Sequence, residues 1–172
     1  AGLMPDGGPY RVAIIADDLT SAADGASPFV ARSQAAIVAR GRPSLRDCAV
    51  LAVDCGSRSA SRFQAAARVA DVTAQLAGRD VLFKTVDSTL RGHVKAELEA
   101  CFKASARKSL VFAPAFPAAG RTTVGGIQLV DGVPVSESVY SRDPLHPARQ
   151  SALAELVPTN VQNVILLNAT TQ

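Results

Sequence analysis

Six short apolar runs, rich in β-branched residues, constrain the fold of this sequence more than any other feature. They cover residues 11–16, 35–39, 49–54, 81–86, 109–115 and 163–168. Runs of this length and composition are typical of strands that are buried on both faces of a parallel sheet. The first run ends abruptly at Asp17 and Asp18, so this strand is expected to lead directly into a polar loop.

Two of the intervening segments have helical periodicity. Residues 61–78 form a predicted helix with Gly78 at the C-terminal cap, and residues 93–108 form another with Arg107 and Lys108 in its last turn. Their predicted apolar faces are Phe63, Ala67, Ala70 and Ala74 in the first, and Val94, Leu98, Cys101 and Phe102 in the second. Strands that alternate with helices predict an α/β fold of three layers, Rossmann-like, in which helices flank a mostly parallel sheet.

One segment breaks this alternation. Residues 127–136 alternate apolar positions around Asp131-Gly132, which predicts a small β-hairpin near 127–136. The length of 172 residues suits one domain. We expect an α/β domain over residues 11–172 and a disordered leader over residues 1–10, which are rich in Gly and Pro.

Composition excludes several classes of partner. The net charge is only +3, and the six Phe and two Tyr are accompanied by no Trp, so a nucleic-acid partner is disfavoured. Neither a membrane span nor a signal peptide is recognisable, so no membrane partner is expected and the expected location is the cytoplasm. The three Cys are expected to be reduced, buried thiols, and the two lone His, His93 and His146, are not expected to bind metal.

Polar residues are concentrated in the loops after four of the predicted strands. These loops cover residues 17–24, 54–59, 84–93 and 113–123. Ligands of open parallel sheets bind at the carboxyl ends of the strands, so these loops predict a binding site. Capping of the next helix would explain one of Asp17 and Asp18 but not both. Arg121 and Thr122 follow a loop stiffened by two prolines, although Arg121 also fits an ordinary solvated position.

The stretch KTVDSTLRGH, residues 84–93, is the densest of these polar segments. It fits a capped helix start, with Asp87, Ser88 or Thr89 as the cap. It also fits an anion site, because Lys84 and Arg91 flank a hydroxyl-rich turn at a predicted helix N-terminus. Asp87 would then accept a hydrogen bond from a substrate hydroxyl. Because the two cations suit an anion and Asp87 suits a hydroxyl, the expected ligand is both anionic and hydroxylated. The sequence contains no phosphate-binding P-loop and no dinucleotide fingerprint.

Three segments together resemble the N-terminal substrate-binding domain of the four-carbon acid sugar kinases. They are IADDLTSAAD, KTVDSTLRGHVKAELEA and FAPAFPAAGRTTVGGIQLVDGVPVSES, the last followed by DPLHP. The sequence departs from the family at two positions, with Ser21 where Gly is common and His93 where Asn is frequent. The resemblance implies an α/β domain that holds threonate, erythronate or a 3-oxo-tetronate, with a terminal hydroxyl receiving the phosphoryl group of ATP.

The resemblance also assigns residues and partners. Catalytic roles fall on Asp17 and Asp18, and substrate binding falls on Lys84, Asp87, Ser88, Arg91, Arg121 and Thr122. ATP, with Mg²⁺, is expected mainly on a C-terminal domain that is absent from this chain, so the chain alone is expected to be inactive. A homo-oligomer is left open. Two alternatives remain at this point: a stand-alone sugar-acid-binding or regulatory module, and an acid-sugar phosphatase or isomerase on a similar sheet.

Overall fold

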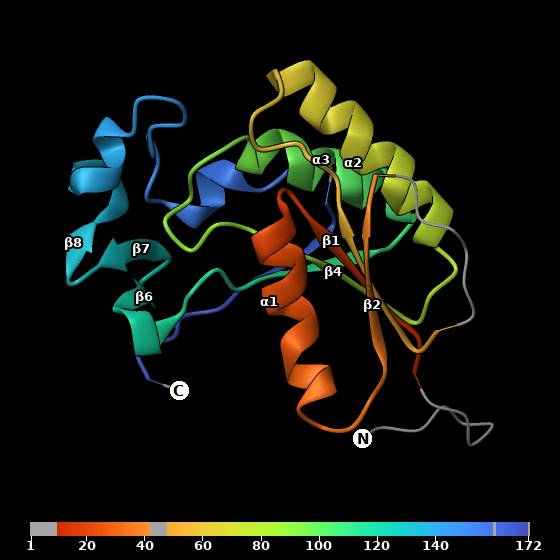
Figure 1. Ribbon diagram of the computed structural model, residues 1–172. Helices are drawn as coiled ribbons and strands as arrows, with labels where there is room; N and C mark the ends of the chain where they lie inside the picture. The colour runs from red at the N-terminus through yellow and green to blue at the C-terminus, as the bar shows by residue number, and fades with distance from the viewer. Residues whose placement is uncertain (1–9, 42–47, 160, 172) are drawn as a thin grey trace.

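The structure, a computed structural model, describes residues 10–41, 48–159 and 161–171 (Figure 1). Of the predicted leader, Tyr10 alone belongs to the described residues, so the expectation of disorder over residues 1–9 lies outside them. The described part of the chain contains no helix that is long and apolar enough to cross a membrane.

All six predicted strands are present, and each ends within a few residues of its predicted limit. They are β1 (Val12–Ala16), β2 (Ala36–Arg40), β3 (Val50–Asp54), β4 (Val81–Lys84), β5 (Ser109–Phe112) and β9 (Asn163–Leu166). The first four form a parallel sheet in the order β2-β3-β1-β4, and β5 pairs with β9 in a separate parallel pair. The parallel strands are therefore divided between two hydrogen-bonded sheets.

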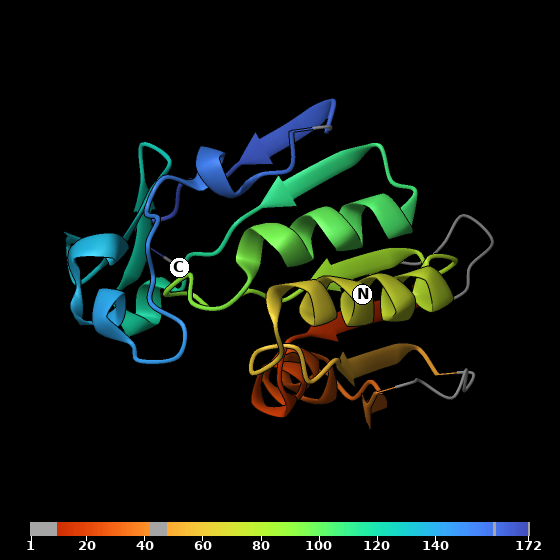
Figure 2. The ribbon, with the colours of Figure 1, turned by 90° about the horizontal axis from the view of Figure 1, so that it is seen from above.

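Helices cover the four-stranded sheet on both faces, which confirms the three-layer α/β prediction (Figures 1 and 2). On one face lies α1 (Leu19–Val30), and on the other lie α2 (Arg62–Leu76) and α3 (Val94–Ser105). The side chain of Ile14 points toward α1, where it joins Ala22 and Ala26 in a buried cluster. Successive residues of a strand point to opposite faces, so Ala13 and Ile15 instead pack against α2.

The predicted apolar face of α2 is wrong. Its buried residues are Ala65, Val69, Val72, Thr73 and Leu76, whereas Phe63 is 84% exposed. The predicted face rested mainly on alanines, which occur all around this helix, while the larger Val and Leu side chains determine which face is buried. The expected cap at Gly78 is also wrong, because the helix ends at Leu76 with Ala77 as its C-terminal cap.

Helix α3 follows its prediction more closely. Val94, Leu98 and Cys101 are buried as expected, while Phe102 is only partly buried. The helix stops at Ser105, with Ala106 in the left-handed conformation (φ 54°). Arg107 and Lys108 therefore lie beyond the last turn, and the guanidinium of Arg107 instead donates to the carbonyl oxygen of Ala77, just after α2.

The predicted hairpin is confirmed and belongs to a small antiparallel sheet. Its strands are β6 (Arg121–Val124), β7 (Ile127–Val130) and β8 (Val133–Pro134). Asp131 and Gly132 both have positive φ, 49° and 82°, as a type I′ hairpin turn requires. Four short 3₁₀ helices surround this sheet: η1 (Pro117–Ala119), η2 (Val135–Glu137), η3 (Val139–Arg142) and η4 (Leu153–Leu156).

The three cysteines are unpaired, as predicted. Cys55 and Cys101 are buried and Cys48 is partly buried. Burial raises the pKa of the Cys55 thiol to about 12, so this thiol is protonated and unreactive at neutral pH.

Candidate functional site

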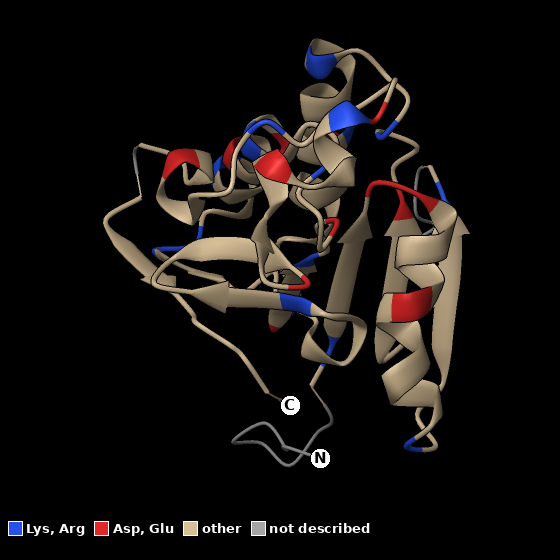
Figure 3. Ribbon diagram, turned by 90° about the vertical axis from the view of Figure 1, so that its left-hand side faces the viewer, with Lys and Arg blue, Asp and Glu red and all other residues tan. Residues whose placement is uncertain are grey.

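The carboxyl ends of β1 and β3 carry the first group of polar side chains, and acidic positions are among them (Figure 3). Asp18 is the N-cap of α1, and its Oδ1 accepts a hydrogen bond from the backbone N–H of Ser21 at 2.7 Å. The capping explanation therefore holds for one of the two aspartates. Asp17, at the end of β1, is buried and has a different partner.

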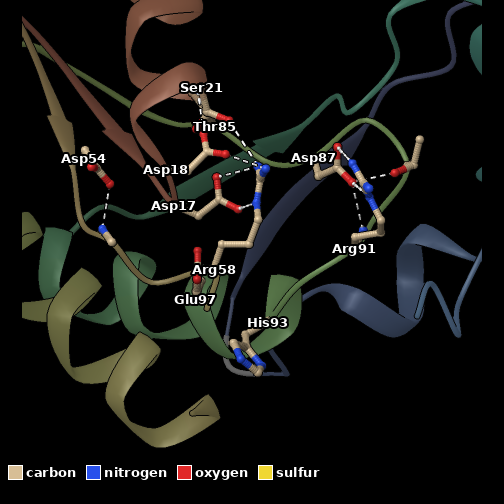
Figure 4. Close-up of polar contacts among 12 residues, drawn as sticks. Asp17, Asp18, Ser21, Asp54, Arg58, Thr85, Asp87, Arg91, His93 and Glu97 are labelled. Carbon is tan, nitrogen blue, oxygen red and sulfur yellow. Dashed lines mark hydrogen bonds and ion pairs between the residues drawn. The ribbon is translucent and has the colours of Figure 1, made fainter. Parts of the chain in front are cut away.

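That partner is Arg58, from the loop that follows β3. Its Nε and Nη2 donate to Asp17 Oδ2 and Oδ1 at 2.7 and 3.1 Å, and its Nη1 lies 2.5 Å from Asp18 Oδ2 (Figure 4). Nη2 also reaches the hydroxyl of Ser21 at 3.3 Å. Burial alone would lower the pKa of Arg58, but the hydrogen bonds and charge of the aspartates raise it. Asp17, Asp18, Ser21 and Arg58 are called the Asp17–Arg58 cluster below.

Backbone contacts fix the loop that carries Arg58. The N–H groups of Ser57 and Arg58 donate to the carbonyl oxygen of Asp17 at 2.9 and 3.2 Å. Three residues later, Ser61 and Gln64 form a capping box at the start of α2. Since the loop is held at both ends, the guanidinium of Arg58 is well placed to bridge the two aspartates.

The loop over residues 84–93 forms a second group. Asp87 Oδ2 accepts from the Thr89 hydroxyl at 2.5 Å and from Arg91 Nε at 2.6 Å, and Arg91 Nη1 lies 3.3 Å from Asp143 Oδ2. Burial would raise the pKa of Asp87, but the hydrogen bonds from Arg91 and Thr89 lower it. The hydrogen bond that Arg91 donates to Asp87 likewise raises the pKa of Arg91. Asp87, Thr89, Arg91 and Asp143 are called the Asp87–Arg91 cluster.

The expectation that this stretch caps a helix is wrong. Helix α3 begins at Val94, and its N-cap, His93, makes no side-chain capping bond. Asp87 instead organises the loop that precedes the helix, in which Leu90 adopts a positive φ of 56°. The ring of His93 contacts the carbonyl oxygen of Ala60 at 2.8 Å and lies edge-on to His146.

Lys84 and Arg91 have different partners. The Nζ of Lys84 lies 2.7 Å from Glu97 Oε2 and donates to the carbonyl oxygen of Thr85. The two charged side chains are 6% and 5% exposed, so this is a buried ion pair between β4 and α3. Among the described contacts none joins Lys84 to Arg91; the two cations of the stretch bind different carboxylates.

Tyr140 brings Arg91 and Arg121 together. The guanidinium carbons of Arg91 and Arg121 lie 5.2 and 5.9 Å from the centre of its ring. Arg121 Nη2 also donates to the Tyr140 hydroxyl at 2.9 Å, whereas its buried Nε has no partner among the described residues. Two further residues predicted to bind substrate are Thr122 and Ser88. Thr122 follows Arg121 in β6, and the carbonyl oxygen of Ser88 accepts a hydrogen bond from Gln128 Nε2.

The two clusters are neighbours. A Cβ atom at Gly92, where φ is +89°, would lie 4.0 Å from Asp17 Oδ2. In addition, the positive charge of Arg58 contributes to the lowered pKa of Asp87. Together the clusters place carboxylates, hydroxyls and guanidinium groups at one end of the sheet, as predicted for the loops after β1, β3 and β4. Arg121, from the fourth polar loop, is connected to them through Tyr140. Within residues 10–41, 48–159 and 161–171, no three His, Cys, Asp or Glu side chains gather as a metal site would require.

Sequence reasoning missed three participants: Arg58, Tyr140 and Asp143. The segment containing Arg58 was recognised as polar, and its position after β3 could have singled it out. Tyr140 and Asp143 reach the site through the irregular chain around η3 (Val139–Arg142), for which the sequence has no periodic signal.

The fold is thus an α/β domain with a charged, hydroxyl-rich candidate site at the carboxyl edge of its parallel sheet. Residues 12–172 match the family described as the sugar-binding N-terminal domain, and the chain belongs to this family. The resemblance drawn from the sequence motifs is thereby confirmed.

Curated relatives are kinases of four-carbon sugar acids. The chain is 37% identical over 153 residues to a D-threonate kinase of Salmonella typhimurium, covering 86% of this chain and 36% of that protein. It is 39% identical over 161 residues to a D-threonate kinase of Bordetella bronchiseptica, covering 88% of this chain and 40% of the relative. The chain therefore spans well under half the length of these relatives.

A crystal structure from Bordetella bronchiseptica is similar in fold. It is a domain of unknown function, DUF1537, solved with bound citrate as a domain-swapped dimer. The TM-score is 0.82 at 33% identity, over 94% of this chain and 47% of that one.

Proposed function

We propose that this chain is the substrate-binding part of an ATP-dependent kinase that phosphorylates a terminal hydroxyl of a four-carbon sugar acid. The observation that carries the proposal is the adjacency of the Asp17–Arg58 and Asp87–Arg91 clusters. Phosphoryl transfer needs a group that orients the attacking hydroxyl and cations that neutralise charge, and these clusters contain both. Threonate, erythronate and 3-oxo-tetronate are the proposed substrates, because relatives are kinases named for these acids.

In this proposal Asp17 and Asp18 act at the reacting hydroxyl. The Asp18 side chain is 30% exposed and that of Asp17 only 7%. This difference favours Asp18 as the carboxylate that meets the hydroxyl and accepts its proton, with Asp17 orienting Arg58. Replacing each aspartate with Asn in turn separates these roles, because loss of the proton acceptor lowers kcat while substrate affinity is largely kept.

The carboxylate of the sugar acid is assigned to Arg91 and Arg121. These guanidinium groups flank Tyr140, and Arg91 is 30% exposed. Guanidinium forks match carboxylates in geometry, and the citrate bound to the Bordetella bronchiseptica relative is itself a polycarboxylate. Asp87, Ser88 and Thr122 would bind the remaining hydroxyls. Lys84 contributes by fixing the start of this loop through its buried pair with Glu97.

ATP is the proposed phosphoryl donor, with Mg²⁺, and a C-terminal domain outside this chain is proposed to bind most of it. The length of the relatives supports this division, as does the lack of a P-loop in the sequence. No ligand of Mg²⁺ is assigned within this chain. The cytoplasm is the proposed location, and the domain-swapped dimer of the Bordetella bronchiseptica relative supports a homo-oligomer.

Calorimetric titration with threonate tests the binding assignment. Arg91→Ala should abolish binding while the fold is retained, whereas Arg149→Ala, at an exposed arginine outside both clusters, should leave affinity unchanged. Unchanged affinity in Arg91→Ala would sink the assignment. Labelled ATP with a panel of four-carbon acids then identifies the substrate in the full-length polypeptide. Phosphorylation of threonate by the 172-residue chain alone would contradict the two-domain proposal.

A further inference from the structure

An uncovered apolar surface lies on the face of β4, β5 and β9 that is opposite to α2 and α3. Its members are Val81, Phe83, Val111 and Ile165, which are 43%, 50%, 56% and 51% exposed. None of the four carries a charge, and we call them the β4–β9 surface. Val81 and Phe83 lie on β4, and Val111 and Ile165 lie on the separate β5–β9 pair. Single exposed apolar residues need no explanation, but exposed apolar residues that recur on the same face of several strands mark an interaction site.

Strand alternation fixes the side to which these residues point. Leu82 packs into the cluster beneath α2, so its neighbours Val81 and Phe83 point to the opposite face. Phe112 and Leu166 pack with Leu98 of α3, so Val111 and Ile165 also point away from the helices. Val111 and Ile165 are register partners in the parallel pair and therefore lie side by side.

Helix α1 covers this face over β1 but not over the adjacent strand β4. Ile14 of β1 is register partner to Phe83 of β4, and both side chains lie on the face that α1 occupies. Ile14 is completely buried beneath α1, whereas Phe83 is half exposed. Figure 2 shows α1 beside β1 and β3, at the far side of the molecule from β5 and β9. One helix therefore covers only part of the face.

We infer that the β4–β9 surface is the docking site of a second amphipathic helix, from the part of the polypeptide that corresponds to the unmatched length of the relatives. Parallel strands are normally buried on both faces by helices, as β1 and β3 are here, where every residue of each strand is buried. The matched relatives carry more than half of their length outside the aligned part, since this chain spans 36% and 40% of two of them. The uncharged, aliphatic and aromatic surface suits a permanent apolar contact. This inference rests on family membership and is independent of the proposed phosphoryl transfer.

The same substitutions, made both in the full-length polypeptide and in the 172-residue chain, test the inference. In the full-length polypeptide, Phe83→Thr and Val111→Thr should each lower the midpoint of thermal unfolding by roughly 4 °C, because a buried apolar contact is lost. In the 172-residue chain the same changes should leave the midpoint nearly unchanged, since these side chains are already exposed there. Phe63→Thr, at the 84% exposed phenylalanine of α2, is the matched control and should have no effect in either length.

Hydrogen–deuterium exchange of the wild-type forms identifies the occupant. Slower exchange of β4 and β5 in the full-length polypeptide, independent of protein concentration, supports a helix of the same polypeptide. Protection that grows with concentration would overturn the inference in favour of a second copy. Equal exchange in both lengths, or a gene that encodes nothing beyond these residues, would also overturn it. Each of these results leaves the sugar-acid titrations unaffected, so the two proposals fail separately.

Discussion

Arg58 and Asp17 are 41 residues apart in sequence, yet they form two hydrogen bonds of 2.7 and 3.1 Å. The same guanidinium reaches Asp18, so a single side chain from the loop after β3 contacts both acids that follow β1. The two adjacent carboxylates therefore share one cationic partner. This sharing also means that a substrate hydroxyl approaching either aspartate meets a group already held by Arg58.

Removing Arg58 should therefore destabilise the fold. Arg58→Ala leaves Asp17 buried without its partner, and we expect a loss of about 2 kcal/mol, below the full cost of breaking a buried pair because Arg58 is partly exposed. Arg58→Lys keeps the charge but not the fork and should lose less. Urea unfolding measures both. Arg62→Ala, at an exposed arginine of α2, is the control; equal stability of the Arg58→Ala and Arg62→Ala variants would contradict the expectation.

The buried pair of Lys84 and Glu97 supports a second prediction. Lys84→Met leaves the Glu97 carboxylate buried without its cationic partner and should lower the free energy of unfolding by about 3 kcal/mol. The double variant Lys84→Met/Glu97→Leu should regain most of that loss. Denaturant unfolding of the single and double variants gives the comparison. Sugar-acid binding that persists in the double variant supports a structural role for Lys84; binding lost despite recovered stability would restore the direct role expected from the sequence.

Acid should weaken the Asp87–Arg91 cluster. The pKa of Asp87 is lowered from 3.8 in the folded protein, so its carboxylate stabilises the fold fully above that value. The stabilisation is lost as the pH falls below 3.8 through the folded-state pKa. The stability difference between wild type and Asp87→Asn should accordingly be larger near about pH 6 than near about pH 3. Unfolding in urea at both pH values measures it, and a difference that does not shrink in acid would contradict this prediction.

Gly120 should tolerate no side chain. It precedes Arg121 with φ at +72°, and a Cβ atom there would fall 2.1 Å from Asp131 Oδ1. Gly120→Ala should cost about 2 kcal/mol through left-handed strain and displacement of Asp131. Gly78 lacks a positive φ and has no heavy atom within 4 Å of such a Cβ, so Gly78→Ala should leave thermal stability unchanged or slightly higher. Similar melting temperatures of the two variants would show that the turn before Arg121 is less constrained than the geometry implies.

Tyr140 provides a prediction about affinity. Tyr140→Phe removes the hydroxyl that Arg121 binds but keeps the ring beside Arg91. Threonate affinity should fall roughly tenfold, because Arg121 loses the group that orients it, while an uncharged four-carbon polyol should show no comparable change. Tyr10→Phe, at an exposed tyrosine, is the calorimetric control. Equal losses for acid and polyol would place Tyr140 outside the carboxylate site.

Local signals predicted the strands well, and long-range contacts account for the errors. The run Val12–Ala16 is apolar throughout and contains three β-branched residues, so its burial is encoded within five residues. The buried face of α2 was assigned wrongly because alanines occupy both sides of that helix and sequence alone did not weight Val69 and Leu76 correctly. The partners of Arg58 and Arg91 lie up to 52 residues away, and no periodic pattern specifies such pairs. Lys84 was expected to bind the ligand anion, and its ion pair was not foreseen because its partner Glu97 lies in the next helix.

The amide of Gln128 links the small antiparallel sheet to the loop over residues 84–93. This side chain is fully buried; its oxygen accepts from the Thr123 hydroxyl, and its nitrogen donates to the carbonyl oxygen of Ser88 at 2.8 Å. A buried amide that loses one of these partners pays a desolvation penalty, so the loop and the hairpin are expected to shift as one unit. In the proposed function, a sugar acid that moves Ser88 would thus also displace Arg121, which pairs with Val130 of β7, so the hydroxyl and carboxylate ends of the ligand would share one mechanical response.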